Sequence, residues 1–392
     1  MARFFVALVS LAACLLGPAA MAQGVVKIGV ILPYSGQFAD TATQIDNGIR
    51  LYLAEHGDTV AGKKIEIVRK DVGGVAPDVA KRLAQELVVR DKVDMLAGFV
   101  LTPNALAASD VSVQAKKPMI IMNAATSIIT TKSPYSVRVS LTLPQVCESL
   151  GHWAAKNGIS QAYTMVSDYA PGHDAEQAFQ RAFKAAGGTI VGEVRFPVNN
   201  PDFSAFVQRA KDTNPQSIFI FVPAGEQPAA LMKTFSERGV LGSGIKILGT
   251  AEAVSDAALK SMGDAAIGII TAGHYDREHQ TRINQEFVRT YQTANGGLYP
   301  DFLAVGGYDG MHLIYEALKK TSGNTEGDAF IGAVKGLSWE SPRGPVEIDP
   351  ETRDIIQTIY IRKVGKVEGQ LANVEFDKIP RVKDPVKAAM AK

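Results

Sequence analysis

The pattern of apolar and polar positions alternates between the periods of strands and helices. Residues 25–32 form a short apolar run, which is typical of a buried strand in a parallel sheet. Ile45, Ile49 and Leu53 then recur at helical spacing, and residues 64–70 alternate apolar and charged side chains as a half-exposed strand does. A strand, a helix and a strand in this order predict βαβ units with a parallel sheet and right-handed crossovers.

The same alternation starts again after Pro144 and predicts a second α/β unit of similar size. In the first unit, further expected elements are a helix at 79–88 and strands at 94–98 and 118–122. In the second unit, we expect helices at 146–157, 175–186, 203–212 and 227–238, and strands at 161–167, 189–196, 217–222, 246–249 and 266–271. Helices at 286–294 and 302–320 and a strand pair at 346–348 and 355–362 follow.

Strand-like segments at 137–143 and 269–275 connect the two units. They predict two Rossmann-like α/β lobes joined by several crossings of the chain. The cleft between such lobes faces the carboxyl ends of both sheets, where open α/β sheets bind ligands. The expected divisions are an N-terminal lobe of 25–142 and 276–338, a C-terminal lobe of 143–275 and 339–377, and a charged, loosely ordered tail at 378–392.

The N-terminus has the features of an export signal. Arg3 precedes an apolar stretch at 4–16, and residues 20–22 form a small-x-small cleavage site. We therefore expect a signal peptide at 1–22, with export to the periplasm. The apolar stretch is shorter than the roughly 20 residues that span a bilayer, and no later segment is long and apolar enough to do so.

The two cysteines limit the chemistry of the mature chain. Residues 11–14 fit a lipoprotein box that would anchor the chain at Cys14, but lipidation there would leave an apolar tail on the mature protein. We therefore favour Cys14 as an ordinary residue of the signal. Cys147 then remains alone and can form neither an internal disulfide nor a cysteine metal cluster.

Composition and motifs argue against several classes of function. The net charge of +1 does not favour nucleic acid or an anionic membrane surface as a partner. The sequence contains no G-x-S-x-G, P-loop or G-x-G-x-x-G motif, and its six histidines form no metal-binding pair. We expect no catalytic residues, no metal and no cofactor.

Two loops are the main candidates for ligand binding. Thr102 is suited to a helix N-cap before Pro103, and the segment Asn123, Ala124, Ala125, Thr126 and Ser127 follows the next strand in the same way. Helix N-termini offer free N–H groups and partial positive charge, so two of them with threonine hydroxyls would hold a carboxylate. The alternative is that these threonines only cap helices.

Other strand ends carry further candidates. Tyr34 and Ser35 end the first strand, and Tyr169 occupies the matching place in the second unit, where its amphipathic ring suits a ligand. Glu226 and Glu252 end later strands. Each acid could meet an ammonium group or could complement a helix dipole. Tyr275 lies on an expected crossing, where a structural role competes with ligand contact.

Four segments together carry a family resemblance. They are VVKIGVILPYSGQFA; KIEIVRKD with PDVAKRLAQELVVRDKVDMLAG; the loop pair GFVLTP and NAATS; and FLAVGGYDGMHLIYEAL followed by SPRGPVEID. In order and spacing, they resemble the type I periplasmic solute-binding proteins of branched-chain amino acid (Leu/Ile/Val-binding) ABC transporters. The resemblance covers nearly the whole mature chain and implies a three-segment hinge between the lobes.

The resemblance also implies a function. Family members trap a solute between lobes that close by hinge bending and then dock on a membrane permease; a monomer is expected. It implies that Thr102 and Thr126 hold the ligand carboxylate, with backbone groups of Val100 and Ala124 beside them. Leu101, Asn123 and Ala125 complete the expected loops.

The second lobe departs from the family pattern. Pro171 replaces the usual aromatic residue, and Glu252 lies in an unusual GTAEA segment. Because an unpaired buried ammonium costs several kcal/mol, this departure favours a plain carboxylate such as a benzoate derivative, although a branched-chain or other hydrophobic amino acid stays open. A ligand-sensing module for a signalling partner is the alternative function, since one fold serves both roles.

Overall fold

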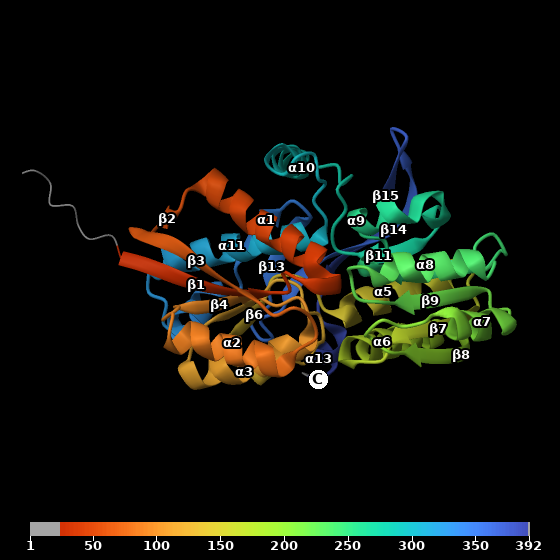
Figure 1. Cartoon of the computed structure of the whole chain (residues 1–392), viewed down its shortest axis with the longest axis horizontal. Coiled ribbons are helices and arrows are strands. Elements are labelled where there is room, and N and C mark those ends of the chain that lie inside the picture. Colours follow the sequence, from red (N-terminus) through yellow and green to blue (C-terminus); the bar gives the residue numbers. More distant parts are fainter. Residues whose placement is uncertain (1–23, 391–392) are drawn as a thin grey trace, which may run out of the picture.

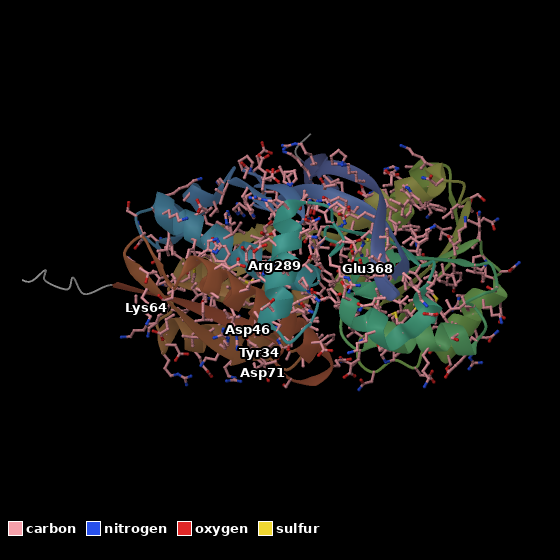
Figure 2. All side chains as sticks on the ribbon, turned by 90° about the horizontal axis from the view of Figure 1, so that it is seen from above. Tyr34, Asp46, Lys64, Asp71, Arg289 and Glu368 are labelled. Carbon is pink, nitrogen blue, oxygen red and sulfur yellow. The ribbon has the colours of Figure 1, made fainter. Side chains whose placement is uncertain are left out.

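The computed structural model of the chain describes residues 24–390. Two α/β lobes lie end to end along the long axis of the molecule (Figure 1), and the view from above shows the same two bodies (Figure 2). The expected signal peptide at 1–22, including Cys14, lies outside the described residues. The two-lobe α/β fold predicted from the hydrophobic pattern is confirmed.

The N-terminal lobe is built on a six-stranded sheet of order β2-β3-β1-β4-β5-β6. Only β2 runs antiparallel to its neighbour, so the carboxyl ends of β1, β4 and β5 meet at one edge. The strands are β1 (Gly24–Leu32), β2 (Thr59–Val60), β3 (Lys63–Asp71), β4 (Met95–Gly98), β5 (Met119–Ile121) and β6 (Ser136–Arg138). The helices are α1 (Ala39–His56), α2 (Pro77–Val89), α3 (Thr102–Ala115), α4 (Ile129–Lys132), α10 (Arg282–Ala294), α11 (Phe302–Lys320) and α12 (Gly327–Val334).

Two glycines set the packing of α1 against α11. A Cβ atom on Gly48 would lie 2.1 Å from the carbonyl oxygen of Ala304, and one on Gly307 would lie 2.1 Å from that of Ile45. The helix backbones therefore approach more closely than any side chain at these positions would allow. This contact fixes a late segment of the chain onto the first helix of the N-terminal lobe.

The second sheet has the order β12-β13-β14-β11-β10-β9-β7-β8, with β15 paired to β14, and its strands β7 to β11 form the centre of the C-terminal lobe. The strands from β7 to β11 are parallel, and β14 joins β11 antiparallel. The strands are β7 (Gln161–Ser167), β8 (Thr189–Phe196), β9 (Ser217–Phe221), β10 (Lys246–Thr250), β11 (Ile270–Gly273), β12 (Ser338–Ser341), β13 (Gly344–Ile348), β14 (Ile355–Val367) and β15 (Gln370–Val382). The helices are α5 (Leu143–Lys156), α6 (Ala170–Ala185), α7 (Ser204–Asp212), α8 (Gln227–Glu237), α9 (Asp256–Met262) and α13 (Pro385–Met390), with short 3-10 turns at η2 (Ala251–Val254) and η3 (Gly263–Ala266). A further 3-10 turn, η1 (Gly36–Phe38), precedes α1 in the N-terminal lobe.

The chain crosses between the lobes after β6, after β11 and along β14. The start of β14 pairs with β13, and its later residues pair with β11. Val346 and Ile348 pack in the hydrophobic core of the N-terminal lobe, although the sequence pattern assigned 339–377 to the C-terminal lobe. We propose that the lobe boundary in this region lies near the start of β14.

The C-terminal segment differs from expectation. The sequence predicted a loosely ordered tail after residue 377, and this prediction is wrong. Strand β15 continues to Val382 in register with β14, and α13 packs against α5. Asp384 and Lys387 are buried, and they bind Ser127 and Asp354 respectively. These partners replace the solvent that charged side chains otherwise bind.

Two further observations concern the described residues as a whole. No helix within residues 24–390 combines the length and the apolar character needed to cross a membrane. In the same part of the chain, no cluster of three or more His, Cys, Asp or Glu side chains has the arrangement of a metal site. Cys147 is a buried free thiol.

Candidate functional site

The two predicted ligand loops meet at the carboxyl edge of the first sheet. Strands β4 and β5 are parallel neighbours, so the segments that follow them lie side by side. The hydroxyl oxygens of Thr102 and Thr126 are 2.9 Å apart, and both side chains are buried. The structure therefore brings together the pair that the sequence predicted.

Free backbone donors lie beside these hydroxyls. The N–H groups of Leu101, Ala125 and Thr126 form no hydrogen bond within the described residues. In contrast, the N–H of Ala124 donates to the carbonyl of Phe99 at 2.8 Å. The available donors of the second loop are thus Ala125 and Thr126, one and two positions beyond the Ala124 that the resemblance implied.

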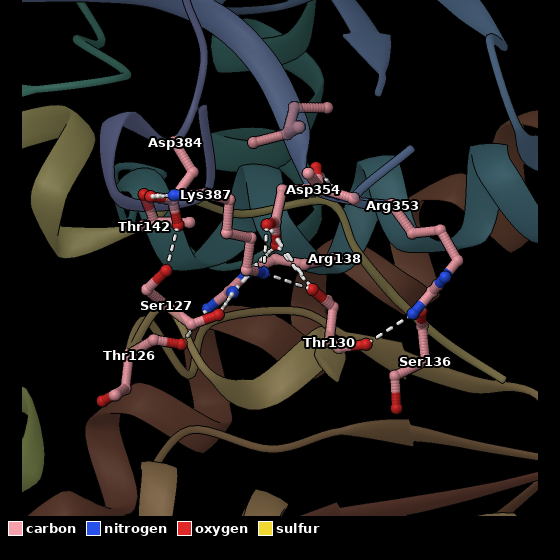
Figure 3. A network of polar contacts seen from close by, with 12 residues as sticks. Thr126, Ser127, Thr130, Ser136, Arg138, Thr142, Arg353, Asp354, Asp384 and Lys387 are labelled. Carbon is pink, nitrogen blue, oxygen red and sulfur yellow. Dashed lines mark hydrogen bonds and ion pairs between the residues drawn. The ribbon is translucent and has the colours of Figure 1, made fainter. Parts of the chain in front are cut away.

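Arg138 holds the second loop in shape. Its Nη1 atom donates to the carbonyl oxygen of Ala124 at 2.9 Å. The same atom donates to that of Thr126 at 2.9 Å, and the Nη2 atom donates to that of Ser127 (Figure 3). Its other side is paired with Asp354. Because the carbonyls point at the guanidinium, the loop turns its N–H groups the other way. Sequence reasoning missed Arg138; the available signal was a single charge inside a short buried strand.

A cavity between the lobes adjoins these loops. Its volume is about 30 Å³, which is about the space of one water molecule. The ring of Tyr169 lies nearly parallel to that of Phe221, at 25° with 6.4 Å between centroids, and gives the second lobe an aromatic wall. The lining residues are Val100, Leu101, Thr102, Asn123 and Ala125 from the first lobe, and Leu143, Tyr169, Pro171, Phe221, Pro223, Ala224 and Glu252 from the second.

Two buried polar atoms of the cavity residues lack partners. The Oε2 atom of Glu252 and the Oδ1 atom of Asn123 form no hydrogen bond among the described residues. Burial raises the pKa of the Glu252 carboxyl and that of the Tyr169 phenol, so both groups favour their neutral forms. Since an unsatisfied buried polar group costs about 1–3 kcal/mol, the arrangement suits a ligand that supplies the missing hydrogen bonds.

Comparison with known proteins decides the family. The family model described as "Periplasmic binding protein" matches residues 25–369. The chain belongs to the periplasmic binding protein family. This binding protein is 42% identical over 382 residues to Leu/Ile/Val-binding protein homolog 6 of Brucella melitensis, which covers 97% of this chain and 98% of that protein.

Solved structures support the same fold and role. A solute-binding protein of an ABC transporter from Rhodopseudomonas palustris BisB5, in complex with 3,4-dihydroxybenzoic acid, is 55% identical with a TM-score of 0.90, over 93% of this chain and 99% of that chain. A similar protein from Rhodopseudomonas palustris HaA2, in complex with p-hydroxybenzoic acid, is 41% identical with a TM-score of 0.90, over 93% and 100%. The prediction of a solute-binding protein is confirmed.

Ala124 and Thr126 are not among the lining residues of the cavity, and Tyr34 and Ser35 lie farther from it. The Tyr34 hydroxyl donates to Asp46 at 3.3 Å, and its N–H donates to Asp71 at 2.8 Å. The three residues lie together on one face of the N-terminal lobe (Figure 2). Ser35 is exposed and does not line the cavity. The hydroxyl of Tyr34, just after β1, therefore forms its hydrogen bond within the N-terminal lobe and is not directed at the ligand cavity.

Glu226 and Tyr275 are also outside the cavity. Glu226 is exposed; its N–H donates to the carbonyl of Gln37 at 3.3 Å, which makes a contact between the lobes at the rim. Tyr275 is buried in the core of the N-terminal lobe, edge-on to Phe287. Of the candidates from the second lobe, Tyr169 and Glu252 reach the cavity.

Proposed function

We propose that this periplasmic binding protein captures an aromatic carboxylate of the hydroxybenzoate class and delivers it unchanged to the permease of an ABC importer. One observation carries the proposal. A single cavity combines Thr102 and free N–H groups on the first lobe with an aromatic wall and a Glu252 oxygen atom that lacks a partner on the second. The complexes of the two Rhodopseudomonas palustris proteins support it.

The first lobe suits the carboxylate of the ligand. Hydroxyl and N–H donors that point at an anion form charge-assisted hydrogen bonds, which are stronger than neutral ones. Thr102 begins α3, so the partial positive charge of a helix N-terminus adds to these donors. An anion held in this way needs no arginine in the cavity.

The second lobe suits a ring with a hydroxyl group. Phe221 and Tyr169 offer flat apolar surface on which an aromatic ring packs, and Glu252 can exchange a hydrogen bond with a phenolic hydroxyl whether or not it is protonated. An amino acid would bring an ammonium group, which requires the ionised form of Glu252. Burial opposes that form, so the site favours the neutral phenol.

Capture follows from the two-sided cavity. Because each lobe supplies part of the lining, a bound ligand interacts fully only when the lobes are closed and shifts the population toward that state. We propose that the chain works as a monomer. We propose export to the periplasm through the signal peptide at 1–22.

Calorimetry tests the proposal directly. The ligands are 4-hydroxybenzoate, 3,4-dihydroxybenzoate, benzoate, leucine, isoleucine and valine. We expect tight binding of the two hydroxybenzoates, weaker binding of benzoate and no detectable heat with the amino acids. Tight leucine binding with no response to the benzoates would overturn the proposed ligand class.

A further inference from the structure

The C-terminal segment, residues 383–390, reaches from the second lobe to the ligand loop of the first. It follows β15, and its helix α13 packs against α5 of the second lobe. Asp384 accepts a hydrogen bond of 2.5 Å from the hydroxyl of Ser127 (Figure 3). Ser127 directly follows Thr126 in the chain, so the contact lies one residue from a proposed ligand group.

A second contact of the segment supports the same loop indirectly. The Lys387 ammonium donates to the Oδ2 atom of Asp354 and to the hydroxyl of Thr130, both at 2.5 Å. The Oδ1 atom of Asp354 is held by Arg138. Arg138 in turn binds the loop carbonyls, so Lys387, Asp354 and Arg138 form a continuous buried chain of charges that ends at the loop.

Ser127 is also a contact point between the lobes. Its N–H donates to the Oδ2 atom of Asp174 at 2.9 Å. Asp174 lies on α6, the helix that begins directly after Tyr169. The loop that carries Thr126 is therefore gripped on one side by the second lobe and on the other by the C-terminal segment.

We propose that residues 383–390 are a positioning element of the ligand site, in which Asp384 and Lys387 hold the Thr126–Ser127 loop in the shape that receives the carboxylate. The inference rests on the proposed carboxylate site at Thr102 and Thr126. Neither Asp384 nor Lys387 lines the cavity, so both act through other groups. Because the segment is anchored on the second lobe and grips the first, its loss should speed release of the ligand from the closed form.

The variants are Asp384→Ala, Lys387→Ala and a chain that ends at Val382. The matched control is Lys383→Ala, in the same segment, because the partly exposed Lys383 pairs with Asp349 at 3.1 Å and, among residues 24–390, forms no hydrogen bond or ion pair with the loop. Titration calorimetry gives the Kd for 4-hydroxybenzoate, stopped-flow fluorescence gives the rate of release, and thermal unfolding without ligand gives the Tm. We expect Kd to rise at least tenfold, mainly through faster release, in the first three proteins and to stay unchanged in the control.

Conservative variants separate positioning from folding. Asp384→Asn keeps an acceptor and Lys387→Arg keeps a cation, so both should retain most of the affinity. A lower Tm with unchanged Kd in Asp384→Ala and Lys387→Ala would overturn the inference. If either variant does not fold, the truncated chain and the conservative variants decide. An unchanged Kd in the truncated chain, or a loss of affinity in the conservative variants as large as in the alanine variants, would then overturn it. If the wild-type protein binds no hydroxybenzoate, the proposed ligand class fails, and the same comparison made with leucine still decides the role of the segment.

Discussion

Arg138 and Asp354 form a buried ion pair of 2.8 Å between the first and the third crossing of the chain. The side chains are 0% and 1% exposed, and the N–H of Arg138 also donates to the carbonyl of Arg353 at 3.0 Å. The pair therefore joins two segments of the hinge and, through the remaining guanidinium donors, the ligand loop. Arg138 therefore helps to fix both the hinge segments and the loop that carries Thr126.

Replacement of Arg138 should destabilise the fold strongly. Arg138→Ala removes the cation at Asp354 Oδ1, although Lys387 still pairs with Oδ2, and leaves three loop carbonyls without their donor. Breaking a buried pair typically costs about 3–5 kcal/mol. Urea unfolding measures the loss. Arg289→Ala is the control, since its pair with Glu286 is exposed and should matter little. Equal stability of the two variants would contradict this account.

Loss of the Thr102 hydroxyl should weaken binding. Thr102→Ala removes one donor to a charged ligand group, which should cost about 1–3 kcal/mol of binding free energy. Calorimetry with 4-hydroxybenzoate measures it. Thr102→Ser keeps the hydroxyl and should bind nearly as well as the wild-type protein. An unchanged affinity in Thr102→Ala would place the carboxylate elsewhere.

The role of Glu252 predicts a difference between two ligands. Glu252→Ala should reduce the affinity for 4-hydroxybenzoate by about 1 kcal/mol or more, because the phenolic hydroxyl loses its partner. Benzoate has no such hydroxyl and should be affected less. Parallel titrations of both ligands give the comparison. A loss of equal size for the two would mean that Glu252 does not contact the hydroxyl group.

Buried Asp276 should make stability depend on pH. Burial raises the pKa of its carboxyl to about 8, so the folded chain keeps a proton that the unfolded chain releases near pH 4. Its contribution to stability is therefore complete at low pH and is lost as the pH rises toward 8. Asp276→Asn, which stays neutral, should gain stability relative to the wild-type protein between pH 5 and pH 8. Unfolding in urea at each pH tests this; a constant difference would contradict it.

The close contact of α1 and α11 should not tolerate a side chain. Gly48→Ala places a methyl group 2.1 Å from a backbone oxygen, and such overpacking costs about 1–3 kcal/mol or more. Gly332→Ala is the control, because a Cβ atom there, in α12, meets nothing within 4 Å. The control should gain about 0.5–1 kcal/mol from helix propensity. Thermal unfolding of both variants checks the opposite signs.

The sequence predicted the fold well because buried side chains recur at the regular spacing of strands and helices. Runs such as residues 161–167 and 302–320 match β7 and α11, since each buries a face that the pattern shows directly. Strand ends were also predictable: Thr102 and Thr126 meet because β4 and β5 are parallel neighbours. The elements themselves, and the strand ends that their order brings together, can therefore be predicted from one sequence.

The rest of the site depends on partners that are distant in the chain. The hydroxyl of Tyr34 donates to Asp46 and its backbone N–H donates to Asp71, away from the cavity, and no local pattern identifies these partners. Lys387 is buried because it forms an ion pair with Asp354, whereas a run of charged residues by itself indicates solvent exposure. Glu226 and Glu252 follow similar strands, and only the three-dimensional structure shows that Glu252 alone of the two lines the cavity.

The path of β14 limits how the two halves of the molecule can move. This strand is hydrogen-bonded at one end to β13 and farther on to β11, and the crossing after β6 runs beside its start. Sliding or twisting of one half against the other would break these ladders, whereas rotation about an axis across the strands would keep them. Binding and release of the ligand should therefore follow rotation of the lobes about a single axis. A membrane partner that separates the lobes by this rotation would release the ligand without unfolding any part of the protein.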